Sequence, residues 1–368
     1  MLRSWILYNI NTIIGEMIKE FVGYGYNISA QNDTLEKYVN ELKKHKSKDI
    51  LIFTPEECNG TPFNFLTINE SLYKEIEDVL LNNDINLFFL YGGHNPPIKY
   101  QIKNLEFLNW PTYLLHYSHH DMTSKYDKSI NELNIDVNFN NLFICLNNLA
   151  KPHRAMMLDY LHKDSLLDRG IFSWNNLTSS HYQKYEFKHW EEKITIIDDQ
   201  HGNYINDYGN VYTNDLLNYK SLISLVGETK YGDVDPYFTT EKTYKNLLLG
   251  QPFVCYGTRR QNLILRDLGF QLYDEIFDNY SFDELPEIED RIEGIVKCLK
   301  NIVNQDYNVI YQKIKTKIEF NKKRAIEIVN KDPFVPEKVI DLYKKHKEQF
   351  LLTDRVPYYF EKMIKNRV

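Results

Sequence analysis

Short apolar runs alternate with amphipathic segments along the first third of the chain. Each apolar run predicts a strand, and each segment with helical periodicity predicts a helix. The predicted strands are 5–8, 49–54, 85–91 and 112–117, and the predicted helices are 13–21, 35–44 and 70–81. Strands separated by helices of this length are typical of βαβ units, which build a parallel sheet. The pattern therefore predicts an α/β domain.

A second set of elements follows a polar stretch at 123–140, which is rich in Lys, Asp, Asn and Ser. We interpret this stretch as the linker between two domains. The strands predicted after it are 141–146, 171–175, 194–199, 253–256 and 269–273, a helix begins at Ala155, and further helices cover 263–268, 290–303, 308–330 and 337–347. The expected domains are residues 1–135 and 136–335. A helical tail at 336–368 either returns to the first domain or lies on a surface.

Local signals are densest at 238–257, which predicts a loop, a short helix and a buried strand. Thr239 or Thr240 can cap the helix, because a hydroxyl there accepts a hydrogen bond from a first-turn N–H group. Gly250 can end it in the left-handed conformation, and the strand 253–256 follows. The apolar stripe of the helix falls at i, i+3 and i+4, on Tyr244, Leu247 and Leu248.

Charged side chains at the start of this helix allow two interpretations. Glu241 suits the positive end of the helix dipole, and Glu241 with Lys245 has the favoured i, i+4 order of an ion pair, so the charges could form an ordinary solvated face. Alternatively, Lys242 and the free N–H groups of the first turn could bind a phosphate. The wider context favours the second interpretation.

Residues 220–260 resemble the donor-binding region of the α1,3/4-fucosyltransferases. That family has a strand ending in Phe-Glu-Asn-Ser, then a loop, then Tyr-Val-Thr-Glu-Lys-Leu, and then Gly-x-Val-Pro-Val-x-x-Gly. Here Glu228 matches the first Glu, Thr229 replaces the Asn, Thr240-Glu-Lys242 matches directly, and Gly257 ends the last strand. The resemblance is weaker over 142–175 and does not extend to the first third of the chain.

The resemblance implies a GT-B architecture, in which two Rossmann-like α/β domains face a cleft. The implied activity is transfer of a sugar (fucose or a related one) from a nucleotide diphosphate donor, GDP-linked in the family, to a glycan hydroxyl. Inversion at the anomeric carbon and independence of metal are also implied.

By the same resemblance, Arg154, with Lys151 as second choice, and Lys242 hold the donor phosphates. Arg suits this role because its planar fork makes bidentate contacts to phosphate oxygens. Glu241 would bind the ribose, and Glu228 would lie near the transferred sugar. The expected donor site also includes Asn147, Ser173, Thr240, Lys245 and Tyr256.

Three loops of the first domain could supply a catalytic base, because ligands of parallel sheets bind beyond the carboxyl ends of the strands. These loops are 55–60, 92–97 and 118–122, and the candidates in them are Glu57 (or Glu56), His94 and Asp121 (or His119 or His120). The family's base motif is not legible here. Ordinary turn chemistry at the Gly-Gly and Pro-Pro pairs is the alternative, and adjacent His-His-Asp side chains are a poor metal site because they point in different directions.

Composition narrows the class of protein. Of 368 residues, 43% are hydrophobic and 14% aromatic, which is ample for two buried cores. The net charge of −7 argues against a nucleic-acid binder without excluding a local basic groove. The four cysteines lie far apart, as reduced core residues do. No apolar run is long enough for a signal peptide or a membrane span, so a soluble cytoplasmic protein is expected.

Several motifs that would indicate another chemistry are missing from the sequence. It contains no Gly-x-Gly-x-x-Gly and no Gly-Lys-Ser/Thr, which disfavours a nicotinamide dehydrogenase or a P-loop ATPase. Asp233-Val-Asp235 has the spelling of a metal-binding signature, but it lies in a polar loop, and we interpret it as coincidence. We therefore expect neither a metal nor a cofactor beyond the nucleotide-sugar co-substrate.

Two other classes remain open at this point. One is a glycosyltransferase that acts on modified bases in DNA, which would need a basic groove in the first domain. The other is a non-catalytic protein that binds a nucleotide or a glycan, which would apply if the first domain supplies no base.

Overall fold

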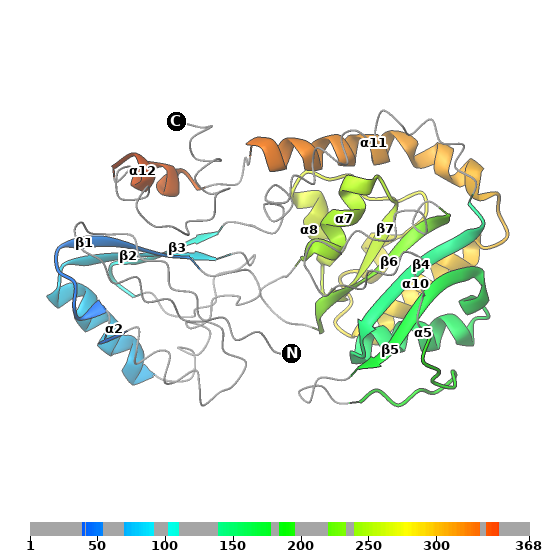
Figure 1. Cartoon of the computed structure of the whole chain (residues 1–368), viewed down its shortest axis with the longest axis horizontal. Helices are drawn as coiled ribbons and strands as arrows, with labels where there is room; N and C mark the ends of the chain where they lie inside the picture. Colours follow the sequence, from blue (N-terminus) through cyan, green and yellow to red (C-terminus); the bar gives the residue numbers. More distant parts are fainter. Residues whose placement is uncertain are drawn as a thin grey trace, which may run out of the picture. The chain divides into compact units, whose positions relative to one another are not determined.

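The computed structural model describes residues 39–40, 42–53, 70–91, 102–109, 139–177, 184–195, 220–232, 239–331 and 336–345. The chain divides into two compact units (Figure 1). Unit 1 comprises Met1–Leu115 and Asn330–Val368, and unit 2 comprises His116–Val329. The sequence placed the first boundary at 135, but residues 110–138 lie outside the described part, so the domain boundaries stay a prediction.

Unit 1 contains a three-stranded parallel sheet in the order β1-β2-β3. Its strands are β1 (Lys48–Phe53), β2 (Ile85–Tyr91) and β3 (Leu105–Asn109). The helix α2 (Glu70–Asn82) and the helix α12 (Glu337–Lys345) lie on opposite faces of this sheet (Figure 1). The strands predicted at 49–54 and 85–91 and the helix predicted at 70–81 are confirmed. The strands 5–8 and 112–117 and the helix 13–21 lie outside the described residues.

Each strand of this sheet follows a residue in the left-handed conformation. Ser47 precedes β1, Asp84 precedes β2 and Asn104 precedes β3, with φ of 50°, 51° and 61°. Short polar side chains tolerate this conformation better than branched ones do, because they can hydrogen-bond locally. The turn residues thus fix where the strands begin, including β3, which the apolar pattern did not predict.

Unit 2 contains a four-stranded parallel sheet in the order β5-β4-β6-β7. Its strands are β4 (Asn141–Leu149), β5 (Gly170–Leu177), β6 (Ser221–Gly232) and β7 (Phe253–Thr258). The helices are α5 (Pro152–Lys163), α7 (Glu241–Leu249), α8 (Gln261–Asp267), α9 (Asn279–Phe282), α10 (Ile288–Ile302) and α11 (Tyr307–Lys331), with a 3₁₀ turn η3 (Leu167–Arg169). The α/β class with parallel sheets is confirmed, whereas an arrangement of two domains about a cleft stays a prediction.

The strand order creates a switch point between β4 and β6. The chain leaves β4 toward β5 on one side, then crosses back to β6 on the other side of β4. Because such crossovers are right-handed, α5 and α7 lie on opposite faces of the sheet. In open sheets of this kind, ligands bind beyond the carboxyl ends of the strands at the switch point. The carboxyl ends of β4 and β6 are therefore the first place to look for a site.

One predicted strand of unit 2 differs from the structure, and a second is described only in part. The prediction of an edge strand at 269–273 is wrong, because the backbone N–H and C=O of Gln271 bond to a side chain and not to a neighbouring strand. Gln271 N donates to Asn321 Oδ1 on α11 (2.7 Å), and Asn321 Nδ2 donates to Gln271 O (2.8 Å). Of the strand predicted at 194–199, the structure describes residues 194 and 195, and Thr195 pairs in an isolated antiparallel bridge with Trp174. The rest of that segment lies outside the described residues.

None of the helices in the described part of the chain is both long and apolar enough to cross a membrane.

Candidate functional site

The start of α5 places two cations at the carboxyl end of β6. The helix begins at Pro152, earlier than the predicted Ala155, because proline suits the first helical position. Lys151, only 3% exposed, donates from Nζ to Thr229 O at 2.5 Å. Arg154, 4% exposed, donates from one guanidinium nitrogen to Gly227 O at 2.9 Å. Both predicted phosphate ligands thus lie at the switch point.

The start of α7 adds a third cation from the opposite face. Thr240, one of the two candidates for the cap (Thr239 or Thr240), is the N-cap residue, and its Oγ1 accepts from Lys242 N at 3.3 Å. Gly250 ends the helix with φ of 69° and ψ of 35°, also as predicted. The Lys242 ammonium lies 3.3 Å from Thr240 Oγ1 and 3.4 Å from Thr229 Oγ1. Lys151 and Lys242 therefore converge on one residue, Thr229, which stands where the fucosyltransferases have Asn.

Glu228 holds β6 and α7 together. Its side chain is fully buried, and its carboxylate accepts from Thr240 N (3.0 Å), Thr240 Oγ1 (2.5 Å), Thr243 Oγ1 (2.5 Å) and Thr229 N (3.3 Å). A buried carboxylate needs such donors, because its desolvation is otherwise costly. The structure thus shows Glu228 in a structural contact; its predicted place near the transferred sugar stays a prediction.

His153 is a residue of this cluster that the sequence did not single out. Its Nε2 lies 2.8 Å from Glu228 O, so Nε2 carries the proton, because a carbonyl oxygen only accepts. The ring stacks on Tyr231 at 4.6 Å. Burial, together with the charge of Arg154, holds the pKa of His153 well below its usual range. His153 is therefore neutral and adds no charge to the three cations. In the sequence, its place between Pro152 and Arg154 was the one indication that it could belong to the cluster.

A chain of hydrogen bonds beneath these residues joins three strands. Tyr256 Oη on β7 donates to Asn147 Oδ1 on β4 at 3.4 Å, and Asn147 N donates to Ser173 Oγ on β5 at 3.1 Å. Burial raises the pKa of Tyr256 well above its usual value. Asn147 and Tyr256 are 1% and 2% exposed. Tyr256, Asn147 and Ser173, which were all predicted to bind the nucleotide-sugar, thus lie together at the site and link three strands of the sheet by hydrogen bonds.

The tyrosine reaches Asn147 only because Gly227 has no side chain. Gly227 lies opposite Tyr256 in the β6–β7 pairing, and the Tyr256 ring crosses over it. A Cβ on Gly227 would lie 2.8 Å from Tyr256 Oη and 3.0 Å from Arg154 Cγ. Glycine is thus required here for the close approach of the tyrosine and the arginine.

The remaining predicted residues are placed less fully. Lys245 lies half-buried on α7, one turn after Lys242. Glu241 is the first residue of α7, but its side chain is not among those described. The three base candidates Glu57, His94 and Asp121 lie outside the described residues, as does Asp233-Val-Asp235. Within the described ranges, no group of three or more His, Cys, Asp or Glu residues could hold a metal ion.

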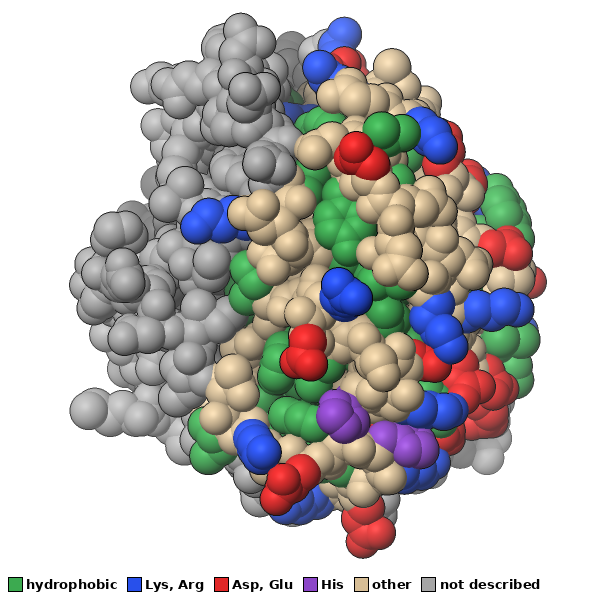
Figure 2. All heavy atoms as spheres, turned by 90° about the vertical axis from the view of Figure 1, so that its right-hand side faces the viewer, with side chains coloured by type: hydrophobic (Ala, Val, Ile, Leu, Met, Phe, Trp, Pro, Cys, Tyr) green, Lys and Arg blue, Asp and Glu red, His purple; other side chains and the backbone are tan. Residues whose placement is uncertain are grey.

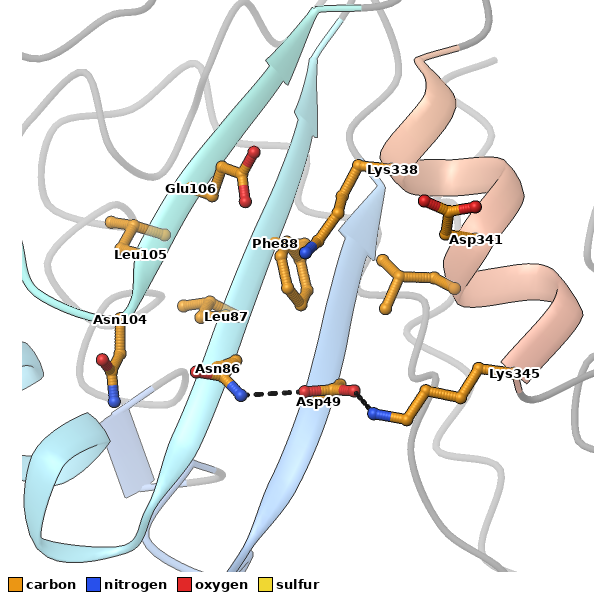
Figure 3. A pocket seen from close by; sticks show the side chains of 11 residues that line it. Asp49, Asn86, Leu87, Phe88, Asn104, Leu105, Glu106, Lys338, Asp341 and Lys345 are labelled. Atoms are coloured by element: carbon orange, nitrogen blue, oxygen red, sulfur yellow. Dashed lines mark hydrogen bonds and ion pairs between the residues drawn. The ribbon is translucent and has the colours of Figure 1, made fainter.

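Unit 1 contains a cavity of about 530 Å³ between its sheet and α12 (Figure 3). It lies at the amino ends of the strands, since Asp49 and Asn86 are each the second residue of their strand. Lys345 Nζ lies 2.6 Å from Asp49 Oδ2, and Lys338 Nζ lies over the Phe88 ring at 5.1 Å. These lysines fasten α12 to the sheet, and the cavity is at the end opposite to where such sheets bind ligands.

One face of unit 2 carries interspersed charges of both signs (Figure 2). A nucleic-acid surface would instead gather lysine and arginine on one face. Within unit 2, ion pairs join opposite charges at Lys163–Glu293 (3.0 Å), Lys188–Glu289 (2.9 Å) and Lys300–Asp164 (2.6 Å). The face in Figure 2 shows no such concentration of lysine and arginine.

Comparison with models of known protein families, with curated proteins and with solved structures found no match for this chain. The case for a function therefore depends on the site itself and on the resemblance in residues 220–260.

Proposed function

We propose that this protein is a glycosyltransferase whose unit 2 binds a nucleotide-sugar donor, GDP-linked by the resemblance, and transfers the sugar to a hydroxyl acceptor. The observation that supports the proposal is the convergence of Lys151, Arg154 and Lys242 at the carboxyl ends of β4 and β6. These cations come from two helix starts on opposite faces of the sheet. Their meeting place is where a parallel sheet of this order binds its ligand.

The chemistry of the reaction explains why such a cluster is useful. Glycosyl transfer leaves growing negative charge on the departing diphosphate, and donors that are already positioned stabilise that charge without reorganisation. The contacts of Lys151 and Arg154 with the β6 carbonyls fix the positions of these two cations. The dipole of α7 adds favourable potential at its start. A carboxylate or histidine of unit 1 would deprotonate the acceptor, with Glu57 as the first candidate.

Thermal unfolding with a panel of nucleotides tests the proposal. Wild type would be compared with Lys242→Ala and with Lys313→Ala, which removes an exposed lysine of α11. GDP, UDP, ADP and CMP would each be added with and without magnesium. A ligand at about 100 times its Kd stabilises the folded protein by about 2.7 kcal/mol, which raises Tm by several degrees.

We expect one diphosphate to raise Tm in wild type and in Lys313→Ala but not in Lys242→Ala. The sugar conjugate of that nucleotide then enters a transfer assay, in which hydrolysis or transfer of the sugar marks an enzyme and binding without turnover marks a binding protein. A nucleotide panel that leaves Tm unchanged would overturn the donor site, and an undiminished shift in Lys242→Ala would remove Lys242 from it.

A further inference from the structure

The hydroxyl of Thr240 lies between a carboxylate and an ammonium. It is 2.5 Å from Glu228 Oε2 on one side and 3.3 Å from Lys242 Nζ on the other, and it also accepts from Lys242 N at 3.3 Å. A hydroxyl has one proton to donate, and the backbone N–H and the ammonium of Lys242 can only donate, so the Thr240 oxygen accepts on that side. The Thr240 proton must therefore point to Glu228, which leaves the oxygen lone pairs facing Lys242.

We propose that Glu228 is a positioning residue that acts through Thr240 to aim the Lys242 ammonium at the end of β6. The carboxylate sets the direction of the Thr240 hydroxyl, and the hydroxyl then accepts from both the backbone N–H and the ammonium of Lys242. The ammonium is thereby held beside Thr229, on which Lys151 also converges. This inference rests on the proposed function for the nature of the ligand, a diphosphate.

The geometry requires a carboxylate at this position, because an amide of the same shape does not fit it. Oε1 accepts from Thr240 N and Thr243 Oγ1, while Oε2 accepts from Thr240 Oγ1 and Thr229 N. Each oxygen thus faces a backbone N–H, which can only donate. Whichever way Glu228→Gln turns its amide, the NH₂ group meets a backbone donor. The substitution therefore disturbs the α7 start while conserving volume.

Binding of inorganic pyrophosphate, measured by calorimetry on the full chain, tests this role. The proteins are wild type, Glu228→Gln, Lys242→Ala and the double variant, at a temperature where circular dichroism shows each one folded. We expect each single variant to bind about tenfold more weakly, the scale of one lost charge-assisted hydrogen bond. The double variant should bind no more weakly than Lys242→Ala alone, because the two residues act through one chain of contacts.

A matched control separates positioning from general destabilisation. Asp283 is also a buried carboxylate, and it accepts from Leu263 N at the start of α8. Asp283→Asn should change the stability of unit 2 and leave the pyrophosphate Kd unchanged. If Glu228→Gln does not fold, Thr240→Ser and Thr240→Val take its place, since the serine keeps the hydroxyl and should keep wild-type affinity, whereas the valine should lose about tenfold.

The outcomes separate this inference from the proposed function. The positioning role would be overturned if Glu228→Gln bound pyrophosphate as tightly as wild type, or if adding Glu228→Gln to Lys242→Ala weakened binding a further tenfold. Neither result would contradict the donor site. Wild type that binds neither pyrophosphate nor any nucleotide would overturn both.

Discussion

Gly227→Ala is the substitution on which the geometry of the candidate site depends most directly. The added methyl would lie 2.8 Å from Tyr256 Oη and 3.0 Å from both Tyr256 Cζ and Arg154 Cγ. The tyrosine cannot swing aside, because it is 2% exposed and bound to Asn147. Overpacking of a core costs about 1–3 kcal/mol, and loss of the tyrosine hydrogen bond adds about 1 kcal/mol. We expect Gly227→Ala to lower the free energy of unfolding by about 2–4 kcal/mol.

Urea unfolding followed by tryptophan fluorescence measures this cost in unit 2. Of the four tryptophans, Trp5 and Trp110 belong to unit 1, so replacing both with Phe leaves Trp174 and Trp190 as reporters of unit 2. Wild type in that background is the reference for all variants. The midpoint and the slope are fitted together, so that a changed unfolded state is not mistaken for lost stability.

A second substitution tests the cause of the cost. Tyr256→Phe removes the closest atom, so adding it to Gly227→Ala should recover part of the loss, with a coupling of about 1–2 kcal/mol. Gly294→Ala creates a comparable clash, 2.4 Å from Phe282 Cβ on other elements, and should not couple to Tyr256→Phe. Stability of Gly227→Ala within about 0.5 kcal/mol of the reference, or strict additivity with Tyr256→Phe, would refute the reasoning.

Three further predictions concern the frame of unit 2. Burial raises the pKa of Asp283 to about 6, so between pH 3.8 and 6 the folded state binds more protons than the unfolded chain does. The free energy of unfolding should therefore fall by up to about 3 kcal/mol as pH rises through that window. Urea midpoints measured across this pH range should lose the dependence in Asp283→Asn. Asn321→Ala removes two hydrogen bonds to Gln271 and should cost about 2–3 kcal/mol; unchanged amide exchange at Gln271 would contradict this. Gly250→Ala should cost about 1 kcal/mol because φ is 69°, and Gly250→Asn less, as read from Tm; equal costs would count against the left-handed explanation.

Local patterns predicted those elements whose signals lie within a few neighbouring residues. The helix α7 is the clearest example, because the Thr240 cap, the apolar stripe and Gly250 are all contained in its own short segment. The strands β2 and β7 were found for a similar reason, since each is a short and nearly continuous apolar run.

The features that the local sequence patterns did not predict depend on contacts between residues that are distant in the sequence. Residues 269–273 have the composition of a strand, but Asn321, about fifty residues later, occupies the backbone groups of Gln271. Tyr256 was expected at the ligand, which stays a prediction, and its hydrogen bond to Asn147 depends on Gly227 in the strand between them. Nothing within either segment indicates these partners.

The candidate site was predicted in its residue types and only partly in its arrangement. Arg154, Lys151 and Lys242 were expected as cations, because of the resemblance. Their convergence follows from the strand order, which brings the ends of β4 and β6 together although the two strands are remote in sequence. His153 was missed because a histidine next to a proline carries no periodic signal.

The bond between Tyr256 and Asn147 also has a consequence for how the chain folds. It joins strands whose residues are 109 positions apart, and it crosses β6 on the way. Closing such a long loop costs entropy before any contact is gained, so distant pairings of this kind form late in folding. Tyr256→Phe should accordingly speed unfolding and leave the refolding rate almost unchanged. Any partly folded chain with β7 undocked lacks the support beneath Arg154, so in nascent unit 2 the proposed phosphate-binding cluster of Lys151, Arg154 and Lys242 is complete only after β7 has docked.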